Sequence, residues 1–186
     1  MSRLYVPTLD DPPLQAVLWR HRQDPWRPMV ACMLLNMTSR RQVDEVWPEL
    51  FDRWPTARDM ADGDPLRQAD VLDPLGLHFR VVHLRQMSRL WAARFPQGFR
   101  SSIVSMLPAW ADQDITWYPG LGRYAQDSYR LFVIGDVHHQ PESGDRVVQA
   151  WRELVRDCGV CLCPRCGVWA PPDHQFVHPS ATAVAQ

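Results

Sequence analysis

The stretch 116-TWYPGLGRYAQDSYRLF-132 joins a Pro-Gly-x-Gly turn to the start of a helical pattern. Glycines at 120 and 122 permit backbone conformations with positive φ and a close approach to another chain. A helix that follows such a turn begins with backbone N–H groups that have no partner within the helix, at the positive end of its dipole. Phosphate binds readily there, and Arg123 adds a charged donor. An ordinary helical hairpin explains the stretch equally well.

Helical patterns lie on both sides of this turn. Residues 24–37 begin with Asp-Pro and are then apolar nearly all round, which is typical of a central buried helix. Apolar residues recur at spacings of three and four in residues 80–95. Further helices are expected at residues 40–54 (kinked at Pro48), 64–72, 103–111 and 142–157. Because no convincing strand pair is found, the sequence predicts an all-α fold.

Composition places the chain among folded intracellular proteins. It has 186 residues, of which 46% are hydrophobic, enough to bury a core. No run of 18 apolar residues and no signal-peptide pattern is found, so we expect a cytoplasmic protein, with no membrane contact, in a compartment that keeps cysteines reduced. All 20 basic residues are arginine, so no lysine Schiff base can form. Because the net charge is only −1, binding to nucleic acid would depend on a local patch of arginines.

Five segments, in order, carry a resemblance to a known family. They are DPWRPMVACMLLNMTS (24–39), FDRWPTA (51–57), LDPLGLHFR (72–80), GLGRYAQDSYRLF (120–132) and the segment around Asp145. In this order and spacing they resemble the helix-hairpin-helix DNA glycosylases, and above all the glycosylase domain of the methyl-CpG-binding thymine glycosylases. The resemblance implies a two-lobed helical domain over residues 1–157, followed by a short Cys- and His-rich tail over residues 158–186.

The resemblance implies excision of a pyrimidine from double-stranded DNA by a monomeric enzyme that needs no cofactor for catalysis. The target would be T or U opposite G, or an oxidised or hydroxymethylated pyrimidine, flipped out of the duplex. Hydrolysis of the N-glycosidic bond passes through an oxocarbenium-like sugar that a carboxylate stabilises. Asp145 matches the position of that carboxylate, although "SGDRVVQAW" also has the pattern of a helix N-cap.

Tyr124 is the second residue to which the resemblance gives a catalytic role. In the family, lysine at this position accompanies strand cleavage, serine occurs in adenine glycosylases, and tyrosine occurs in thymine and uracil mismatch glycosylases. Tyrosine can stack on a pyrimidine or hydrogen-bond to it, and it forms no imine. Together with the absence of lysine, this predicts a monofunctional glycosylase. The alternative is a tyrosine that packs the hairpin.

The resemblance also implies a set of DNA contacts: Gly120, Gly122, Arg123, Leu75, Leu77, Asn36, Arg40 and Gln15. Leu75 and Leu77 match a loop that fills the gap left by the flipped base, although turn packing is an alternative explanation. Met37 stands where the thymine glycosylases have an arginine, and Val147 stands where they have lysine. These departures indicate that mismatch handling differs.

Cysteines gather in the tail at positions 158, 161, 163 and 166, with His174 and His178 close behind. Paired Cys-x-x-Cys units are typical of zinc sites. The ligands would be Cys158, Cys161, Cys163 and Cys166, or else Cys163 and Cys166 together with His174 and His178. Many relatives hold an iron–sulfur cluster after the last helix, with wider cysteine spacing. Structural zinc, an iron–sulfur cluster and unmetallated thiols therefore remain alternatives.

Two other functions compete with excision. The same fold appears in phage pathways that elaborate hydroxymethylated pyrimidines in DNA without excising them. A DNA-binding module without catalysis is the third alternative, against which Asp145 argues. In each case we expect a nucleoid-associated protein of a prokaryote or phage.

Overall fold

The computed structural model describes residues 6–14, 25–96, 98, 114–162 and 169–173. In chain order the helices are α2 (Trp26–Leu35), α3 (Arg40–Arg53), α4 (Ala57–Asp62), α5 (Pro65–Leu72), the short 3-10 turns η1 (Asp73–Leu75) and η2 (His78–Arg80), α6 (Val81–Arg94), α8 (Arg123–Ser128), the π-helix η3 (Tyr129–Ile134) and α9 (Arg146–Asp157). Strands β1 (Cys161–Leu162) and β2 (Trp169–Ala170) pair antiparallel. The helix expected at 103–111 lies outside the described residues.

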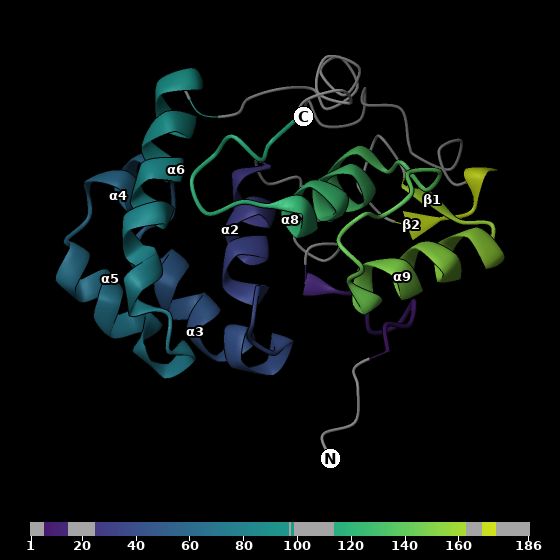
Figure 1. The fold of residues 1–186 in the computed structure, drawn as a ribbon, viewed down its shortest axis with the longest axis horizontal. Helices are drawn as coiled ribbons and strands as arrows, with labels where there is room; N and C mark the ends of the chain where they lie inside the picture. The colour runs from purple at the N-terminus through teal and green to yellow at the C-terminus, as the bar shows by residue number, and fades with distance from the viewer. Residues whose placement is uncertain (1–5, 15–24, 97, 99–113, 163–168, 174–186) are drawn as a thin grey trace, which may run out of the picture.

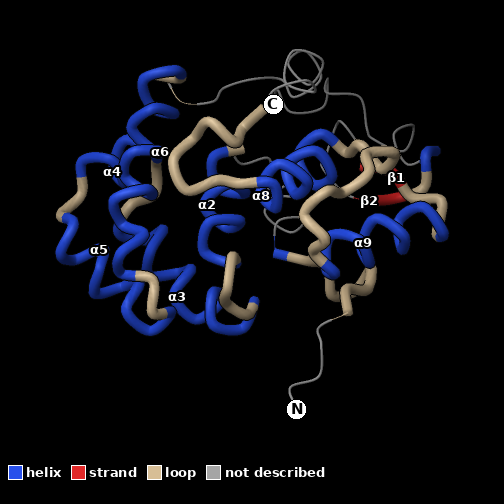
Figure 2. Tube along the Cα trace, in the orientation of Figure 1, coloured by secondary structure: helices blue, strands red, loops and turns tan. Residues whose placement is uncertain are grey.

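Helix α2 lies at the centre of the molecule, with α3 to α6 on one side and α9 on the other (Figures 1 and 2). Every residue of α2 except Arg27 and Leu35 is buried. The helix has apolar side chains nearly all round, so no side of it is stabilised by exposure to water. The indole N–H of Trp26 donates to Ser88 Oγ on α6 at 3.0 Å, which satisfies a buried polar group. The predicted central helix is confirmed.

Side-chain caps begin the three helices that follow α2. Ser39 and Gln42 form a reciprocal capping box at α3, and Thr56 and Asp59 form another at α4. Asp64 accepts from the N–H of Leu66 at 2.9 Å and begins α5. Each cap satisfies backbone donors that the first turn leaves without a partner. The starts predicted for α3 and α5 are therefore confirmed, and α3 continues through Pro48.

Three details differ from the sequence prediction. Pro25 is the N-cap of α2, one residue before the helix begins. Helix α8 has six residues and passes directly into the π-helix η3, which ends at Gly135 with φ +79. The two-residue strand pair β1–β2 was not expected, since strands this short leave no alternating pattern in the sequence.

Two hydrophobic clusters divide the described residues into lobes. The larger contains α2 to α6, the turn before α8 and part of η3. The smaller consists of Leu131, Phe132, Val148, Trp151, Val155 and Trp169. The predominantly helical, two-lobed fold predicted from the sequence is thus confirmed, and the strand pair is a small addition to it. None of the described helices has the length and apolarity that crossing a membrane requires.

Candidate active site

The turn before α8 passes very close to α2 and α6. Tyr118 N–H donates to the carbonyl of Ile115 at 3.1 Å and begins the turn. Gly120 has φ +82, and a Cβ there would lie 2.8 Å from Met33 Cε and 2.9 Å from His83 Cβ. Both the backbone conformation and the space therefore favour glycine at this position.

Gly122 differs from Gly120 in both respects. It is the N-cap of α8 with φ −125 and ψ −162, so only Gly120 uses the positive φ that glycine allows. Nothing lies within 4 Å of the place a Cβ would take at Gly122. A hollow of about 340 Å³ opens at this end of the helix, lined by Asp114, Thr116, Gly122, Arg123 and Gln126.

The charges beside this hollow have mixed signs. The Arg123 guanidinium, predicted to contact phosphate, pairs with the carboxylate of Glu142. Asp114 accepts hydrogen bonds from the hydroxyl and N–H of Thr116 at 2.6 and 2.8 Å, and these bonds lower the pKa of Asp114. A DNA phosphate that binds Arg123 would therefore compete with Glu142, beside the negative charge of Asp114.

Tyr124 lies where the two lobes meet. It is the second residue of α8, is half-buried, and packs against the edges of both hydrophobic clusters. This position suits a residue that contacts a base held between the lobes, and it also suits a residue that packs the hairpin.

Asp145 caps α9. Its Oδ1 accepts from the N–H groups of Val147 and Val148 at 3.0 and 2.9 Å, while its own N–H donates to Ser143 Oγ at 3.3 Å. No hydrogen bond to Oδ2 is found within the described part of the chain. Both interpretations of the sequence therefore fit at once, because one carboxylate oxygen caps the helix and the other can face a substrate.

Asp127 is a buried carboxylate that the sequence analysis overlooked. Its Oδ2 accepts from the N–H groups of Glu142 and Ser143 at 3.0 and 2.8 Å, and its Oδ1 lies 2.7 Å from His139 Nε2. Burial raises the pKa of Asp127, but the hydrogen bonds from Ser143, His139 and Glu142 outweigh burial and lower it. The sequence does contain a signal for this burial. Asp127 lies four residues before Leu131, which places it on the apolar face of the hairpin helix.

The loop between α2 and α3 presents an exposed methionine. Asn36 and Met37 are both exposed, and Met37 has φ +75. Arg40, predicted to contact DNA, forms ion pairs with Asp11 at 2.9 Å and Asp44 at 3.3 Å. In this structure the guanidinium of Arg40 therefore ties the N-terminal segment to α3.

Leu75 and Leu77 do not project from the surface. Only 7% and 4% of these residues are exposed, since both pack into the larger hydrophobic cluster. The described conformation thus fits the interpretation in which the two leucines pack the turn. In this conformation neither side chain can reach into a DNA duplex. Phe79, two residues further on, is 59% exposed.

The remaining predicted residues lie at or beyond the edge of the described structure. Gln15, Cys163, Cys166, His174 and His178 are outside it. Cys158, at the end of α9, is exposed, and Cys161 lies in β1. Among residues that are described, no three His, Cys, Asp or Glu side chains are placed to hold a metal ion. The tail site therefore stays a prediction.

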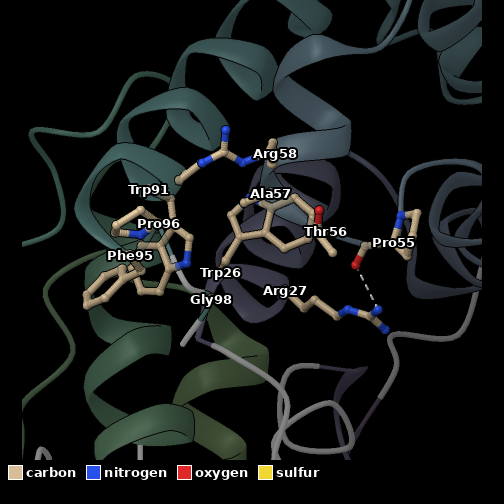
Figure 3. A pocket seen from close by; sticks show the side chains of 11 residues that line it. Trp26, Arg27, Pro55, Thr56, Ala57, Arg58, Trp91, Phe95, Pro96 and Gly98 are labelled. Atoms are coloured by element: carbon tan, nitrogen blue, oxygen red, sulfur yellow. Dashed lines mark hydrogen bonds between the residues drawn. The ribbon is translucent and has the colours of Figure 1, made fainter. Parts of the chain in front are cut away.

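A second hollow, of about 470 Å³, opens beside α2, α4 and α6 (Figure 3). The ring systems of Trp26, Trp91 and Phe95 line it, and the guanidinium of Arg27 donates to the carbonyl of Pro55 at 3.0 Å. Neither Tyr124 nor Asp145 lines this hollow, so it is separate from the candidate active site.

Comparison with known proteins relates the chain to base-excision enzymes. No protein-family model matches it. The chain is 30% identical over 119 residues to a thymine/uracil-DNA glycosylase of Pyrobaculum aerophilum, and 35% identical over 118 residues to a thymine-DNA glycosylase of Aeropyrum pernix. It is also 30% identical over 116 residues to a methyl-CpG-binding domain protein 4-like protein of Arabidopsis thaliana. The chain is thus similar, over part of its length, to two proteins named as DNA glycosylases.

The relationship covers part of each protein. About 63% of this chain is aligned with the two archaeal glycosylases, and the chain spans about half of their length. It covers 23% of the plant protein. The resemblance stated from the five sequence segments is confirmed as a relationship to DNA glycosylases.

Proposed function

We propose that this glycosylase relative is a monofunctional DNA glycosylase that excises a mispaired or modified pyrimidine from double-stranded DNA. The observation that carries the proposal is the geometry of Asp145. One carboxylate oxygen holds the start of α9, and the other is left without a hydrogen bond by the described residues. A carboxylate fixed in this way can act on a substrate without reorganising.

The proposed chemistry needs one carboxylate and one water molecule. The bond between C1′ and the base nitrogen breaks, and its electron pair leaves with the base. Asp145 stabilises the positive charge that develops on the sugar. Water then adds to C1′, Asp145 accepts a proton from that water, and the departing base takes up a proton in turn. Without lysine in the chain, no lysine imine can cut the strand afterwards, so an intact abasic site is the product.

Tyr124 supports the choice of a pyrimidine. Its half-buried ring lies between the two lobes, where a flipped base would be held. A phenol ring can stack on the base, and its hydroxyl can hydrogen-bond the base edge. Met37 and Val147 stand where the thymine glycosylases have arginine and lysine, so we propose that the target base or its partner differs from theirs.

A duplex panel tests the proposal. The protein is incubated with duplexes that carry G·T, G·U, hydroxymethyluracil or A·8-oxoguanine, and strand breaks are scored after heating in alkali. We expect breaks for at least one pyrimidine substrate only after alkali, because the abasic site is left intact. A change in the mass of the base without an abasic site would favour base modification, and a shifted gel band without either product would favour a binding module.

The variant Asp145→Asn separates catalysis from folding. Asparagine is as good an N-cap as aspartate, so α9 should keep its stability, whereas the loss of the carboxylate charge should lower the excision rate at least about 100-fold. Duplex binding, measured by fluorescence anisotropy, should change little. An excision rate equal to that of the wild type would overturn the assigned role of Asp145.

A further inference from the structure

We propose that Asp127 is a positioning residue, which holds the loop before Asp145 in a fixed relation to the hairpin helix. The inference rests on the proposed glycosylase function and deepens it. Asp127 lies on α8, three residues after Tyr124, and only 2% of it is exposed. Removing a carboxylate from water to this extent costs free energy unless hydrogen bonds compensate for the lost hydration.

Within the described part of the chain, the hydrogen bonds that Asp127 accepts come from the loop between η3 and α9. The backbone N–H groups of Glu142 and Ser143 donate to its Oδ2, and His139 contacts its Oδ1. Bonds from N–H to a carboxylate are stronger than bonds between neutral groups. Asp127 therefore fastens the last part of the loop to the helix that carries Tyr124.

The anchor reaches Asp145 through Ser143. Ser143 Oγ accepts from the N–H of Asp145, and Gly144 lies between the two residues with φ +70. Among the described residues, nothing lies within 4 Å of the place a Cβ would take at Gly144, so the chain is open on that side. Glycine is the most flexible residue, so Gly144 alone does not fix the direction in which the chain enters α9. The bond from Ser143 to Asp127 restricts that direction.

This arrangement joins the two residues of the proposed site. Tyr124 and Asp127 both lie on α8. Asp145 is held in place by its hydrogen bonds to the first turn of α9 and by its bond to Ser143, which in turn bonds to Asp127. An error of about 1 Å in the place of a catalytic group can cost about 100-fold in rate. Asp127 thus keeps Tyr124, the proposed base contact, and Asp145, the proposed catalytic carboxylate, in a fixed position relative to each other.

The variant Asp127→Asn tests the proposal against a matched control. We expect its single-turnover excision rate to fall about 10- to 100-fold, while its Kd for a duplex with an abasic-site analogue changes less than about threefold. The control is Asp136→Asn, because Asp136 accepts from the N–H groups of His138 and His139 at the start of the same loop. Asp136 shares His139 with Asp127 but, among the described residues, accepts no hydrogen bond from Glu142 or Ser143. Its rate should stay within about threefold of the wild type. Equal losses of rate in both variants would overturn the positioning role.

Ser143→Ala provides a second variant in case Asp127→Asn does not fold. It removes the hydroxyl that accepts from the Asp145 N–H and that also hydrogen-bonds to Asp127, and it leaves the backbone bonds to Asp127 in place. We expect a fall of about 5- to 10-fold in the excision rate with a small change in Kd. If both single variants fold, the double variant should lose less rate than the product of the single losses, because the two residues act in one network. Multiplicative losses would contradict this route.

Amide hydrogen exchange tests the same link without any activity. In Asp127→Asn the amides of Glu142, Ser143 and Asp145 should exchange at least about 10-fold faster than in the wild type, and in Asp136→Asn they should not. Unchanged exchange at these amides would overturn the inference even in an active enzyme. A wild-type protein that excises no base from the duplex panel would instead overturn the proposed function, and the exchange experiment would still decide whether Asp127 anchors the loop.

Discussion

Gly120 shows how a single residue connects the hairpin to the core. Its positive φ turns the chain towards α8, and its missing side chain lets the turn lie against Met33 of α2 and His83 of α6. Gly122, two residues later, has neither constraint. Two glycines that look equivalent in the sequence therefore have different physical roles.

Replacing these glycines by alanine should separate the two roles. We expect Gly120→Ala to lower the free energy of unfolding by about 2 kcal/mol, since the left-handed backbone conformation and the contact with His83 Cβ both penalise a side chain. Gly122→Ala should lower it by less than about 1 kcal/mol, because alanine is a poorer N-cap than glycine but meets no steric conflict there. Urea unfolding followed by circular dichroism measures both values, and equal effects would contradict this assignment.

At the scale of elements, the segment from η3 to α9 is held by two aspartates. Asp127 fastens residues 142 and 143, and Asp136 fastens residues 138 and 139 while forming an ion pair with Arg130 at 3.0 Å. For Asp136, burial raises the pKa, but the hydrogen bonds from Arg130 and the loop outweigh burial and lower it. The loop is therefore ordered by charged acceptors, without regular secondary structure.

Acid should weaken these anchors. The pKa values of Asp127 and Asp136 are lower in the folded protein than the value near 3.9 of an unfolded aspartate. Their stabilisation is thus complete above about pH 4 and is lost as the pH falls through the lowered values. We expect the unfolding free energy, measured in urea between pH 6 and pH 2.5, to decline below pH 4. The double variant Asp127→Asn, Asp136→Asn should decline less steeply, and identical slopes would contradict this account.

At the scale of the whole molecule, aromatic packing joins the tail to the smaller lobe. Trp169 of β2 packs edge-on against Trp151 of α9, with 5.8 Å between the ring centroids. The strand pair β1–β2 holds Trp169 in place, beyond the end of α9 at Asp157. The chain after residue 157 therefore contributes to a hydrophobic core as well as carrying the cysteines.

Two tryptophan variants measure this contribution. Trp169→Ala removes a buried ring and should lower the unfolding free energy by about 3 kcal/mol. Trp117→Ala removes a ring that is 51% exposed and stacks on Tyr118, so we expect a loss below about 1.5 kcal/mol. Thermal unfolding by calorimetry compares the two. A loss from Trp169→Ala no larger than that from Trp117→Ala would show that the tail is not part of the core.

The parts of this fold that depend on local chemistry could be read from the sequence. Ser39 and Asp64 cap their helices because capping needs only neighbouring residues, and α2 is buried because it is apolar on every side. The burial of Leu77 and the pairing of Arg123 with Glu142 depend on segments distant in the chain, which a local pattern does not reveal. Asp145 was found through family resemblance, whereas Asp127 became visible only when the loop was seen folded back on α8.

The π-helix η3 also bears on how this chain can change length over generations. A π-helix has about one more residue per turn than an α-helix, so deleting one residue from Tyr129–Ile134 would restore the narrower turn. A wide turn with the added residue and a narrow turn without it cover nearly the same rotation, so the chain after Ile134 would keep its direction relative to α8. Glu142 and Ser143 would still meet Asp127, so a single-residue deletion should be tolerated better in this segment than in α9, where it would rotate the following residues by about 100°.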